Sequence, residues 1–589
     1  MMQRLRTWLD ANPSRALAAA LAALLGLCLL AFFNQLGSLG LLDKTEGLFV
    51  EVPRQMVLSG DWVTPRWNGE TFFDYPVWGY WMVGLSFQVF GISEWSARLP
   101  AALAATAVVF ALFGLLLALA PAQESVSDRF GRATLCAGLL ALSPGWVGWG
   151  RSSVTDMFLA SGISLALLGF ALAYWRRDRP WLRQLGHVAL ALFCGVAVLA
   201  KGPVGLLLPG LVIIGFLLLR RDLWPEVRQT PWLPLLSLFI GVTLPWYAAA
   251  TQVNGFNFLA RFIGFSNLER FTSVIYAHPG PPWFYLPWLL LLALPWSLYL
   301  PAAILDLQVW APQRWHRADG GSALAQLALI WLVVVVGFFS AAATKLPGYI
   351  LPVVPGAALL VGLFFAPLSA RPPRALWLDR LQRGSGWFNA LLLGAMALAA
   401  VLAPRLIEVD PSYPGFAGAI ARSGLPWLLA LPLAAACAGL IVVLRDANPE
   451  ALRWLWLPNT AGFAAVLALV IPVLAPLMDR ERLLPIRVLA RQAAAAAQPG
   501  EPLLVAGYKR YSVVFYSGRP VLFVHDARSA LEQLEAQANP AGSVLVLGSD
   551  RELLDLGVGP GDAELLGRLD AHRLIRLDRS TLDQLSERP

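Results

Sequence analysis

The chain has 589 residues, of which 57% are hydrophobic and only 14% are charged, with a net charge of +8. A soluble protein carries about a quarter charged residues, so this composition excludes an ordinary soluble enzyme. The basic residues fall in short loops between apolar blocks, where such residues set membrane orientation, and they do not indicate a nucleic-acid partner.

The first apolar block covers residues 16–37 and follows Arg4, Arg6 and Arg15. It is long for the core of a signal peptide, and no convincing small-x-small cleavage site follows it. We therefore expect an uncleaved first membrane span. The four cysteines of the chain lie inside apolar runs without CxxC or CxH spacing, so neither disulfides nor a thiolate metal site is expected.

Further apolar blocks follow along the chain, and most have roughly the 17 to 24 residues that a helix needs to cross a membrane. With the first block, they are 16–37, 77–92, 97–120, 133–149, 155–175, 184–200, 203–219, 232–251, 283–304, 323–343, 347–367, 387–404, 425–444 and 455–478. The block 77–92 is short and contains glycine. If it does not cross, most loop arginines fall on the cytoplasmic side, and the opposite loops are short or carry few basic residues, as the positive-inside rule requires. We therefore predict about thirteen spans, with 77–92 at the outer interface.

This count places the first outer loop, residues 38–96, and the segment after the last span outside the cytoplasm. The N-terminus is then cytoplasmic. The predicted protein is a polytopic α-helical membrane protein with a membrane domain over 1–478.

The segment 479–589 has a different character. "EPLLVAGYKRYSVVFYSGRPVLFV" and "AGSVLVLGSD" contain alternating or short β-branched runs, whereas "ARSALEQLEAQA" has helical spacing. We predict a small extracytoplasmic α/β domain without a glycine-rich nucleotide motif.

Polar residues gather near the outer ends of the predicted spans, where charges are costly unless they are paired or line a wet cavity. They are Asp43, Glu46, Arg54, Arg66, Asp74, Tyr75, Arg151, Asp156, Lys201, Glu269, Arg270, His278, Lys345 and Tyr349. Acids and bases on one face suggest a cleft for a phosphorylated lipid. Basic groups would hold the phosphate, and a carboxylate would activate an attacking hydroxyl or steer a cation.

Simpler roles exist for several of these residues. Asp43 can be a solvated loop charge, and Asp156 can stabilise the N-terminus of a span through the helix dipole. Lys201 and Lys345 can snorkel to the interface, and His278 can be an ordinary loop histidine. The convergence of all these residues on one face favours a site.

Six ordered segments resemble a known family. They are "DKTEGLFVEVPRQMVLSGDWVTPRWNGETFFDYPVWGYW", "GISEWSARLP", "GRSSVTDMFLA", "LAKGPVGLLLP", "ERF…HPGPPWFYLPWLLLLALPW" and "TKLPGYILPVVPGAALL". Together they resemble the bacterial 4-amino-4-deoxy-L-arabinose transferases of the wider GT-C group, which includes protein O-mannosyltransferases. The resemblance implies a membrane glycosyltransferase of a bacterial inner membrane. It would take a sugar from a polyprenyl-phosphate carrier on the outer leaflet and pass it, with inversion, to a lipid or glycan acceptor.

The resemblance also implies a base in the first outer loop, where family motifs read Asp-Glu or Asp-x-Asp-Glu. Glu46 matches the Glu and Asp43 the outer Asp, while Thr45 replaces the inner Asp. We predict Asp43 as the base, with Glu46 and Asp156 ordering the site or holding a divalent cation. The reverse assignment of Asp43 and Glu46 stays open.

The family motif "EKPPLYYW" carries a phosphate-binding Lys, and Tyr75 stands in its place here. The predicted carrier-phosphate ligands are Lys201, Arg270, Lys345 and Tyr349, supported by Arg54, Arg66, Asp74, Tyr75, Arg151 and Glu269. His278 is the candidate metal ligand. Two rival functions remain: a transporter or flippase of a lipid-linked substrate, and a non-catalytic GT-C-like subunit, which the Thr45 and Tyr75 departures keep open.

Overall fold

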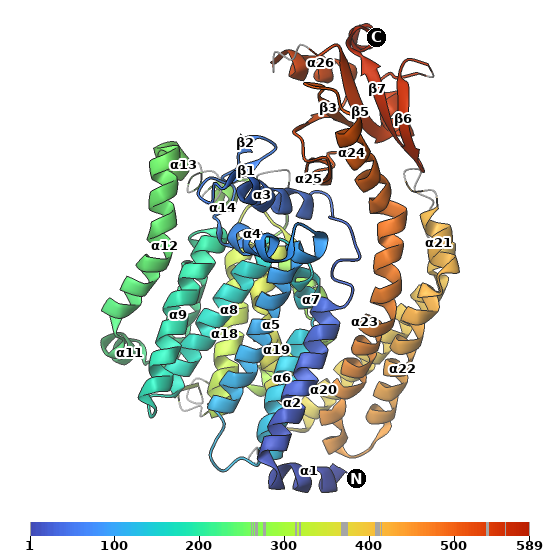
Figure 1. Ribbon diagram of the computed structural model, residues 1–589. Coiled ribbons are helices and arrows are strands. Elements are labelled where there is room, and N and C mark those ends of the chain that lie inside the picture. Colours follow the sequence, from blue (N-terminus) through green and yellow to red (C-terminus); the bar gives the residue numbers. More distant parts are fainter. Residues whose placement is uncertain are drawn as a thin grey trace.

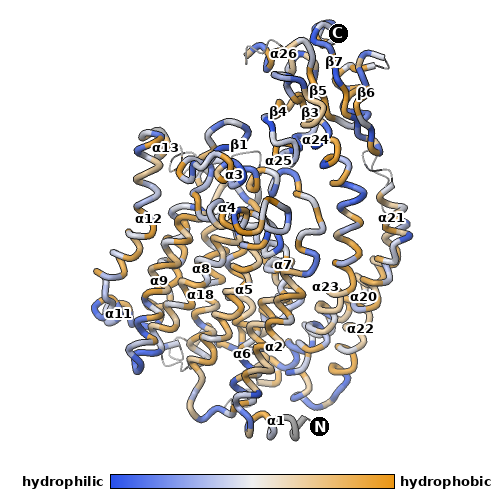
Figure 2. The backbone as a smooth tube through the Cα atoms, viewed as in Figure 1, coloured by the Kyte–Doolittle hydropathy of each residue, from blue (hydrophilic) through white to orange (hydrophobic). Residues whose placement is uncertain are grey.

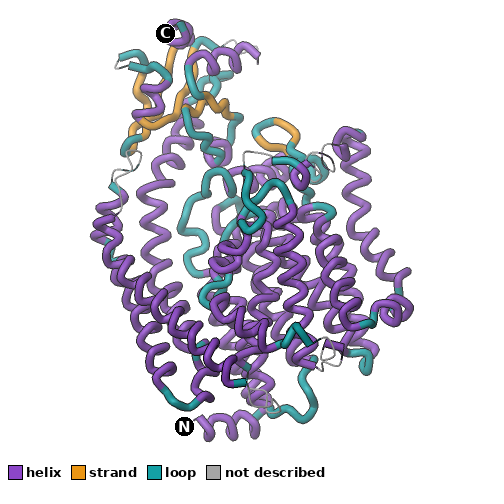
Figure 3. The backbone as a smooth tube through the Cα atoms, turned by 180° about the vertical axis from the view of Figure 1, so that it is seen from behind, coloured by secondary structure: helices purple, strands orange, loops and turns teal. Residues whose placement is uncertain are grey.

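A computed structural model describes residues 2–260, 262, 264, 269–274, 278–311, 315–316, 320–366, 375–406, 413, 415–536, 541–559 and 561–587. A bundle of long helices forms most of the molecule, and a small α/β domain stands at one end of it (Figure 1). The N-terminus lies at the opposite end of the bundle. Strands occur in the α/β domain and in one hairpin between the domain and the bundle (Figure 3).

Apolar sequence blocks become the helices of the bundle. Its principal elements are α1 (Met2–Ala11), α2 (Pro13–Cys28) continued by η1 (Leu29–Phe33), α5 (Glu94–Ala118), α6 (Val126–Ala141), α7 (Pro144–Gly150), α8 (Thr155–Trp175), α9 (Pro180–Lys201), α10 (Val204–Arg220), α11 (Leu223–Gln229), α12 (Trp232–Asn254), α15 (Tyr285–Leu292), η3 (Trp296–Tyr299), α16 (Leu300–Asp306), α18 (Gly320–Ala341), η4 (Pro347–Val353), α19 (Val354–Phe365), α20 (Leu376–Leu406), α21 (Phe416–Arg422), α22 (Leu425–Arg445), η5 (Pro449–Trp454) and α23 (Trp456–Met478). Hydrophobic residues fill the middle of the bundle, and hydrophilic residues gather at both ends (Figure 2).

Ten helices of the described chain are long and apolar enough to cross a membrane, and a bent pair formed by Tyr285–Leu292 and Trp296–Asp306 makes an eleventh. The shorter apolar helix α10 covers another predicted span. The predicted span 133–149 is wrong in detail, because Ser143 and Pro144 divide it into α6 and the short α7. Proline fits the first turn of a helix, where its missing N–H would have no helical partner, and α7 begins at Pro144.

Small residues let α8 and α9 pack closely as antiparallel neighbours. A Cβ added at Gly169 would lie 2.8 Å from the carbonyl oxygen of Gly186, and one added at Gly162 would lie 3.0 Å from the Cβ of Ala197. Apolar burial gives little preference for helix contact inside lipid, so close van der Waals packing of small residues holds such helices together.

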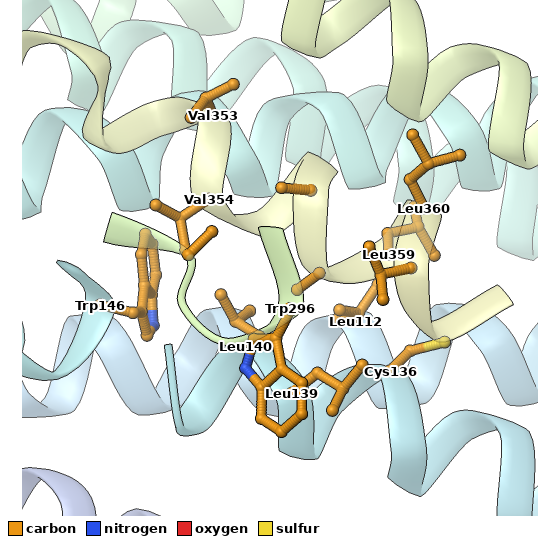
Figure 4. Packing of buried hydrophobic residues seen from close by; sticks show 14 of the residues in the cluster. Leu112, Cys136, Leu139, Leu140, Trp146, Trp296, Val353, Val354, Leu359 and Leu360 are labelled. Atoms are coloured by element: carbon orange, nitrogen blue, oxygen red, sulfur yellow. The ribbon is translucent and has the colours of Figure 1, made fainter. Parts of the chain in front are cut away.

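Large side chains fill the centre of the bundle. Figure 4 shows Trp146 and Trp296, both almost fully buried, among aliphatic side chains such as Leu139, Leu140 and Val354. These residues come from α6, α7, η3 and α19, so the core joins segments that are far apart in the sequence.

The first outer loop forms a cap on the bundle. It contains α3 (Glu46–Ser59), a hairpin of β1 (Arg66–Trp67) and β2 (Glu70–Thr71), and α4 (Trp78–Phe90). The helix α4 corresponds to the short block 77–92 and lies across the end of the bundle in Figure 1, as expected for a segment that does not cross.

The α/β domain has a five-stranded sheet in the order β4-β3-β5-β7-β6. Its elements are α24 (Leu484–Ala496), β3 (Leu503–Ala506), α25 (Ser512–Ser517), β4 (Val521–Val524), α26 (Ala527–Ala536), β5 (Ser543–Ser549), α27 (Asp550–Asp555), β6 (Glu564–Leu569), β7 (His572–Asp578) and α28 (Arg579–Ser586). The strands β4, β3 and β5 are parallel, and β7 and β6 are antiparallel to their neighbours. The predicted polytopic helical fold with a C-terminal α/β domain is confirmed.

The domain is joined to the bundle in two ways. The last span α23 continues through the π-helical turn η6 (Asp479–Leu483) directly into α24. In addition, one hydrophobic cluster contains Val50, Val83 and Phe87 of the outer loop together with Leu489 and Val514 of the domain. The domain therefore shares a core with the loop that caps the bundle.

Candidate functional site

A cavity of about 660 Å³ lies between the outer loop and the ends of the bundle helices. Segments that are distant in the sequence line it together. Its lining is Lys44, Thr45, Leu48, Phe49, Asp74, Tyr75, Gly148, Trp149, Ser152, Val154, Asp156, Lys201, His278, Trp288, Thr344, Leu346, Pro347, Gly348 and Tyr349. Six of the residues predicted from the sequence thus share one cavity.

The ion pair between Asp156 and Lys201 follows from the α8–α9 packing. Asp156 lies in the first turn of α8 and Lys201 is the last residue of α9, where the helix dipoles favour an acid and a base respectively. Because the two helices run antiparallel, these two ends meet. Lys201 Nζ lies 2.5 Å from Asp156 Oδ1, and both side chains are only partly buried.

Two tyrosines surround the Lys201 ammonium. Its Nζ lies 4.9 Å from the ring centroid of Tyr349 and 5.6 Å from that of Tyr75, within the range of a cation–π contact. Tyr75 and Asp74 come from the turn before α4. Together with Lys201 and Tyr349 they also line an adjoining cavity of about 110 Å³.

Because Gly348 has no side chain, the η4 segment can lie close to the Asp156–Lys201 ion pair. A Cβ at this position would lie 3.0 Å from Asp156 Oδ1 and 3.0 Å from the indole nitrogen of Trp149. A side chain there would displace the Asp156 carboxylate, which explains why a glycine fits next to Tyr349.

Glu46 lies outside this cavity, in a fully bonded buried ion pair. Its oxygens accept from Arg98 Nε at 2.8 Å and from Arg98 Nη2 at 2.5 Å, and also from the backbone N–H groups of Ser153 and Leu42. Burial alone would raise the pKa of this carboxyl, but Arg98 and the backbone donors together hold it below its usual range. Glu46 thus ties the outer loop to the segment before α8.

Asp43 points to the α/β domain. Its Oδ1 accepts from the backbone N–H of Ser512 at 2.8 Å, and the residue does not belong to the cavity lining. Burial raises the pKa of the Asp43 carboxyl, an effect that the Ser512 N–H and the charge of Arg510 partly oppose. Asp43, which the sequence predicted to be the base, therefore lies at the contact between the outer loop and the α/β domain.

Two predicted basic residues, Arg54 and Arg151, make their contacts outside the cavity. Arg54 forms a two-pronged ion pair with Glu51 at 2.6 and 2.7 Å. Arg151 donates to the carbonyl oxygens of Ala31 and Asn34 at the end of the first span.

Lys345 was predicted to bind phosphate, but its Nζ donates to the carbonyl oxygens of Ser340 and Ala342, at 2.9 and 2.6 Å. It does not belong to the lining of either cavity. This contact satisfies the end of α18, where helix carbonyl groups lack partners.

Four predicted site residues remain: Arg66, Glu269, Arg270 and His278. Arg66 and Glu269 are exposed, and the side chain of Arg270 lies outside the described part of the chain. His278 lines the cavity, but within the described residues no three His, Cys, Asp or Glu side chains lie together as metal ligands. The structure thus gives His278 no partners for the predicted metal role.

Sequence reasoning missed the aromatic and backbone parts of the cavity. Trp149 and Trp288 line it, as does Lys44, whose backbone has the left-handed φ of 67°. Tryptophans are abundant in the spans, so nothing in the sequence distinguishes these two from the others. Lys44 was visible only as the neighbour of Asp43.

Two family descriptions match parts of the chain. Residues 74–248 match "Dolichyl-phosphate-mannose-protein mannosyltransferase", which covers Asp74, Tyr75, Asp156 and Lys201. Residues 496–589 match "Cyanobacterial RgtA-type glycosyltransferase, C-terminal domain".

Known relatives extend the similarity over more of the chain. The undecaprenyl phosphate-alpha-4-amino-4-deoxy-L-arabinose arabinosyl transferase of Pseudomonas paraeruginosa is 34% identical over 366 residues, which are 62% of this chain and 61% of that protein. The transferase of the same name from Shewanella sediminis is 32% identical over 55% of this chain and 56% of its own. The matched region thus spans about three fifths of the length of these relatives.

Solved structures show that the fold extends over the whole chain. ArnT from Cupriavidus metallidurans bound to undecaprenyl phosphate has a TM-score of 0.72 at 23% identity, covering 95% of this chain and 98% of that one. Its apo form gives the same TM-score at 22% identity, with 96% and 99% covered. The chain thus has the fold of ArnT over nearly its whole length, and over about three fifths of it the sequence is similar to the aminoarabinose transferases.

Proposed function

We propose that the protein is a membrane glycosyltransferase that moves a sugar from a polyprenyl-phosphate carrier to a lipid or glycan hydroxyl in this cavity. The observation that carries the proposal is the Lys201 ammonium, which lies at the cavity wall between Asp156, Tyr75 and Tyr349. A lysine beside carboxylates, at the end of the membrane spans, suits a phosphate that arrives on a lipid tail. The relatives are named as transferases of a sugar linked to undecaprenyl phosphate, and these names support the same chemistry.

The carrier phosphate is proposed to bind Lys201. An ammonium has three donors, so it can keep its bond to Asp156 while it donates to a phosphate oxygen. Asp156 would then fix the direction of the Lys201 side chain. Tyr75 and Tyr349 would flank the phosphate, and Tyr75 would replace the lysine of the family motif with a hydroxyl donor. Lys345 has no part in this proposal, because its ammonium serves the end of α18.

The transfer requires one carboxylate as a base. The acceptor oxygen forms a bond to the anomeric carbon, the bond from that carbon to the phosphate oxygen breaks, and the acceptor proton passes to the carboxylate. The leaving phosphate takes the electron pair of the broken bond and stays on Lys201. Asp74 and Asp156 are the carboxylates of the cavity lining. We assign the base to Asp74 in place of Asp43, because Asp74 lines both this cavity and the adjoining one beside Lys201, whereas Asp43 lines neither.

We also propose that the cavity opens outside the cytoplasm. The N-terminus and the Arg-rich loops 176–183, 220–229 and 445–454 lie at the opposite end of the bundle (Figure 2). Cysteines introduced at the exposed Ser59 and Ser580, with the half-buried Cys437 replaced, should react with an impermeant thiol reagent in intact cells. A cysteine at the exposed Arg179 should react only after lysis. Protection of Ser59Cys or Ser580Cys in intact cells would contradict this orientation.

The transfer itself is tested with purified protein in lipid vesicles. Undecaprenyl phosphate carrying 4-amino-4-deoxy-L-arabinose is the first donor, membrane lipid extract supplies acceptors, and release of undecaprenyl phosphate is measured. The unmodified protein should release carrier only with acceptor present. Asp74→Asn should reduce the rate on the order of 10²–10⁴-fold, as loss of a general base does. Glu70→Gln, which changes an exposed acid of the same loop outside the cavity, is the matched control and should keep the rate.

The outcomes separate the rival functions. Movement of intact donor across the bilayer without release would identify a flippase. Tight binding of undecaprenyl phosphate without transfer to any acceptor, across a panel of donor sugars, would favour a non-catalytic subunit. Normal release by Asp74→Asn would reject Asp74 as the base but leave the transferase proposal standing.

A further inference from the structure

The α/β domain contacts the cavity wall through a short segment of the outer loop. Asp43 accepts from the Ser512 N–H at 2.8 Å, and Lys44 Nζ lies 4.9 Å from the ring centroid of Tyr508. Lys44 and the next residue, Thr45, line the cavity. The domain therefore contacts a residue of the cavity wall directly, through Lys44.

The contact is close along its whole length. The Leu41 N–H donates to the Tyr516 hydroxyl at 2.8 Å. A Cβ added at Gly47 would lie 2.5 Å from the backbone nitrogen of Ser512, so the two backbones touch where only glycine fits. Both ends of the loop segment 41–47 are thus fixed on the domain.

A second contact holds the β1–β2 hairpin on the same domain. The Asn68 side chain donates to the Val521 carbonyl oxygen at 2.9 Å and accepts from the Val521 N–H at 2.8 Å. This pair completes the edge of β4 as a neighbouring strand would. The ring of Trp67 packs against Tyr511 and Phe523 of the domain.

The topology of the sheet explains which edge of the domain makes this contact. From β3 the chain passes to β4 on one side, and β5 then lies on the other side of β3. In open α/β sheets, ligands bind at the carboxyl ends of the strands at such a switch point. In this domain, the domain's own side chains occupy that position. Glu552, which follows β5, pairs with Arg510 at 3.0 Å and accepts from the Tyr508 N–H at 3.1 Å.

We propose that the α/β domain is a positioning element of the cavity, in which segment 507–512 holds Asp43 and thereby places Lys44 and Thr45 in the cavity wall. In this role Asp43 works as a hydrogen-bond acceptor for Ser512, and its capacity to take a proton is not used. The left-handed backbone of Lys44, with φ of 67°, needs such support, because a non-glycine residue seldom adopts it unaided. The inference rests on the proposed function for its effect on transfer.

Two substitutions of one residue separate positioning from catalysis. Asp43→Asn keeps an oxygen that accepts from Ser512 N–H, whereas Asp43→Ala leaves this donor without its partner. A positioning role predicts that Asp43→Asn stays within a few-fold of the parent transfer rate. Asp43→Ala should lose on the order of ten- to a hundredfold, mainly as a raised KM for the acceptor. A base would lose its rate equally in both variants.

A labelling measurement tests the same inference without activity. In protein freed of its other cysteines, Thr45→Cys reports the cavity wall through its rate of reaction with a small maleimide. Asp43→Ala should change that rate several-fold, while Asp43→Asn should not. Tyr508→Leu replaces an exposed side chain and should leave the fold intact. It should change the labelling rate in the same direction as Asp43→Ala, by a smaller factor. Lys509→Ala, the exposed neighbour on the same segment, is the matched control and should leave labelling unchanged.

The results have distinct meanings. Equal loss of transfer in Asp43→Asn and Asp43→Ala, with unchanged Thr45Cys labelling, would overturn the positioning role and return Asp43 to the role of base. If the unmodified protein transfers no sugar, the proposed function fails, but altered labelling in Asp43→Ala would still support the positioning role.

Discussion

Two ion pairs at the end of the bundle that carries the α/β domain differ in what surrounds them. In the Glu46–Arg98 pair, the guanidinium makes five hydrogen bonds, two to Glu46 and three to the carbonyl oxygens of Leu36, Leu39 and Gly40. Both side chains are almost completely buried. In the Asp156–Lys201 pair, both side chains are partly exposed and line a cavity.

The difference shows how to distinguish a structural charge from a functional one in this molecule. A buried pair whose hydrogen-bonding groups are all occupied can only hold segments together. A pair at a cavity wall can exchange partners with a ligand. Both pairs look alike in the sequence, as an acid and a base near predicted span ends.

The largest effect is expected from breaking the buried pair. Arg98→Ala would leave Glu46 buried without a counter-charge, and such changes cost about 3–5 kcal/mol of folding free energy. We expect loss of monodisperse protein after detergent extraction, or a strongly lowered midpoint of thermal unfolding. Arg66→Ala, which removes an exposed arginine of the same loop, should behave as the parent.

Lowering the pH tests the same ion pair in a second way. The folded-state pKa of Glu46 is lowered, so its pair contributes stability above the ordinary carboxyl pKa, and this contribution is lost as the pH falls through the lower folded value. The thermal midpoint of the parent should therefore fall more between pH 6 and pH 3 than that of Glu46→Gln, which has no carboxyl to protonate at this position. Identical pH profiles would show that the pair does not stabilise the fold.

A smaller effect, on binding rather than folding, is expected from the cavity pair. Lys201→Gln should weaken binding of undecaprenyl phosphate by about 1.5–3 kcal/mol, the value of a hydrogen bond to a charged group. Its thermal midpoint should stay close to that of the parent, because Asp156 is partly exposed to solvent. Lys345→Gln is the matched control and should keep the affinity. Equal loss of affinity in both variants would place the phosphate nearer to Lys345.

The sequence predicted the fold well because hydropathy alone locates most spans and β-branched alternation locates the strands of the domain. It also brought Asp156 and Lys201 to one face, since consecutive antiparallel spans end together. The sequence could not show which way the side chains of Asp43 and Glu46 point. Their partners Ser512 and Arg98 lie 469 and 52 residues away, and no local pattern records such contacts.

The continuous helix from α23 into α24 has a consequence for where the C-terminal domain begins. The recognised C-terminal family match starts at residue 496, yet Ile486, Leu489, Ala490 and Ala493 of α24 pack in the same hydrophobic cluster as β3 and β5. A fragment cut at residue 496 would expose that face of the sheet to water. Exchange of this domain between proteins, by recombination or by engineering, therefore has its natural joint near residue 484, just after the end of the last apolar helix.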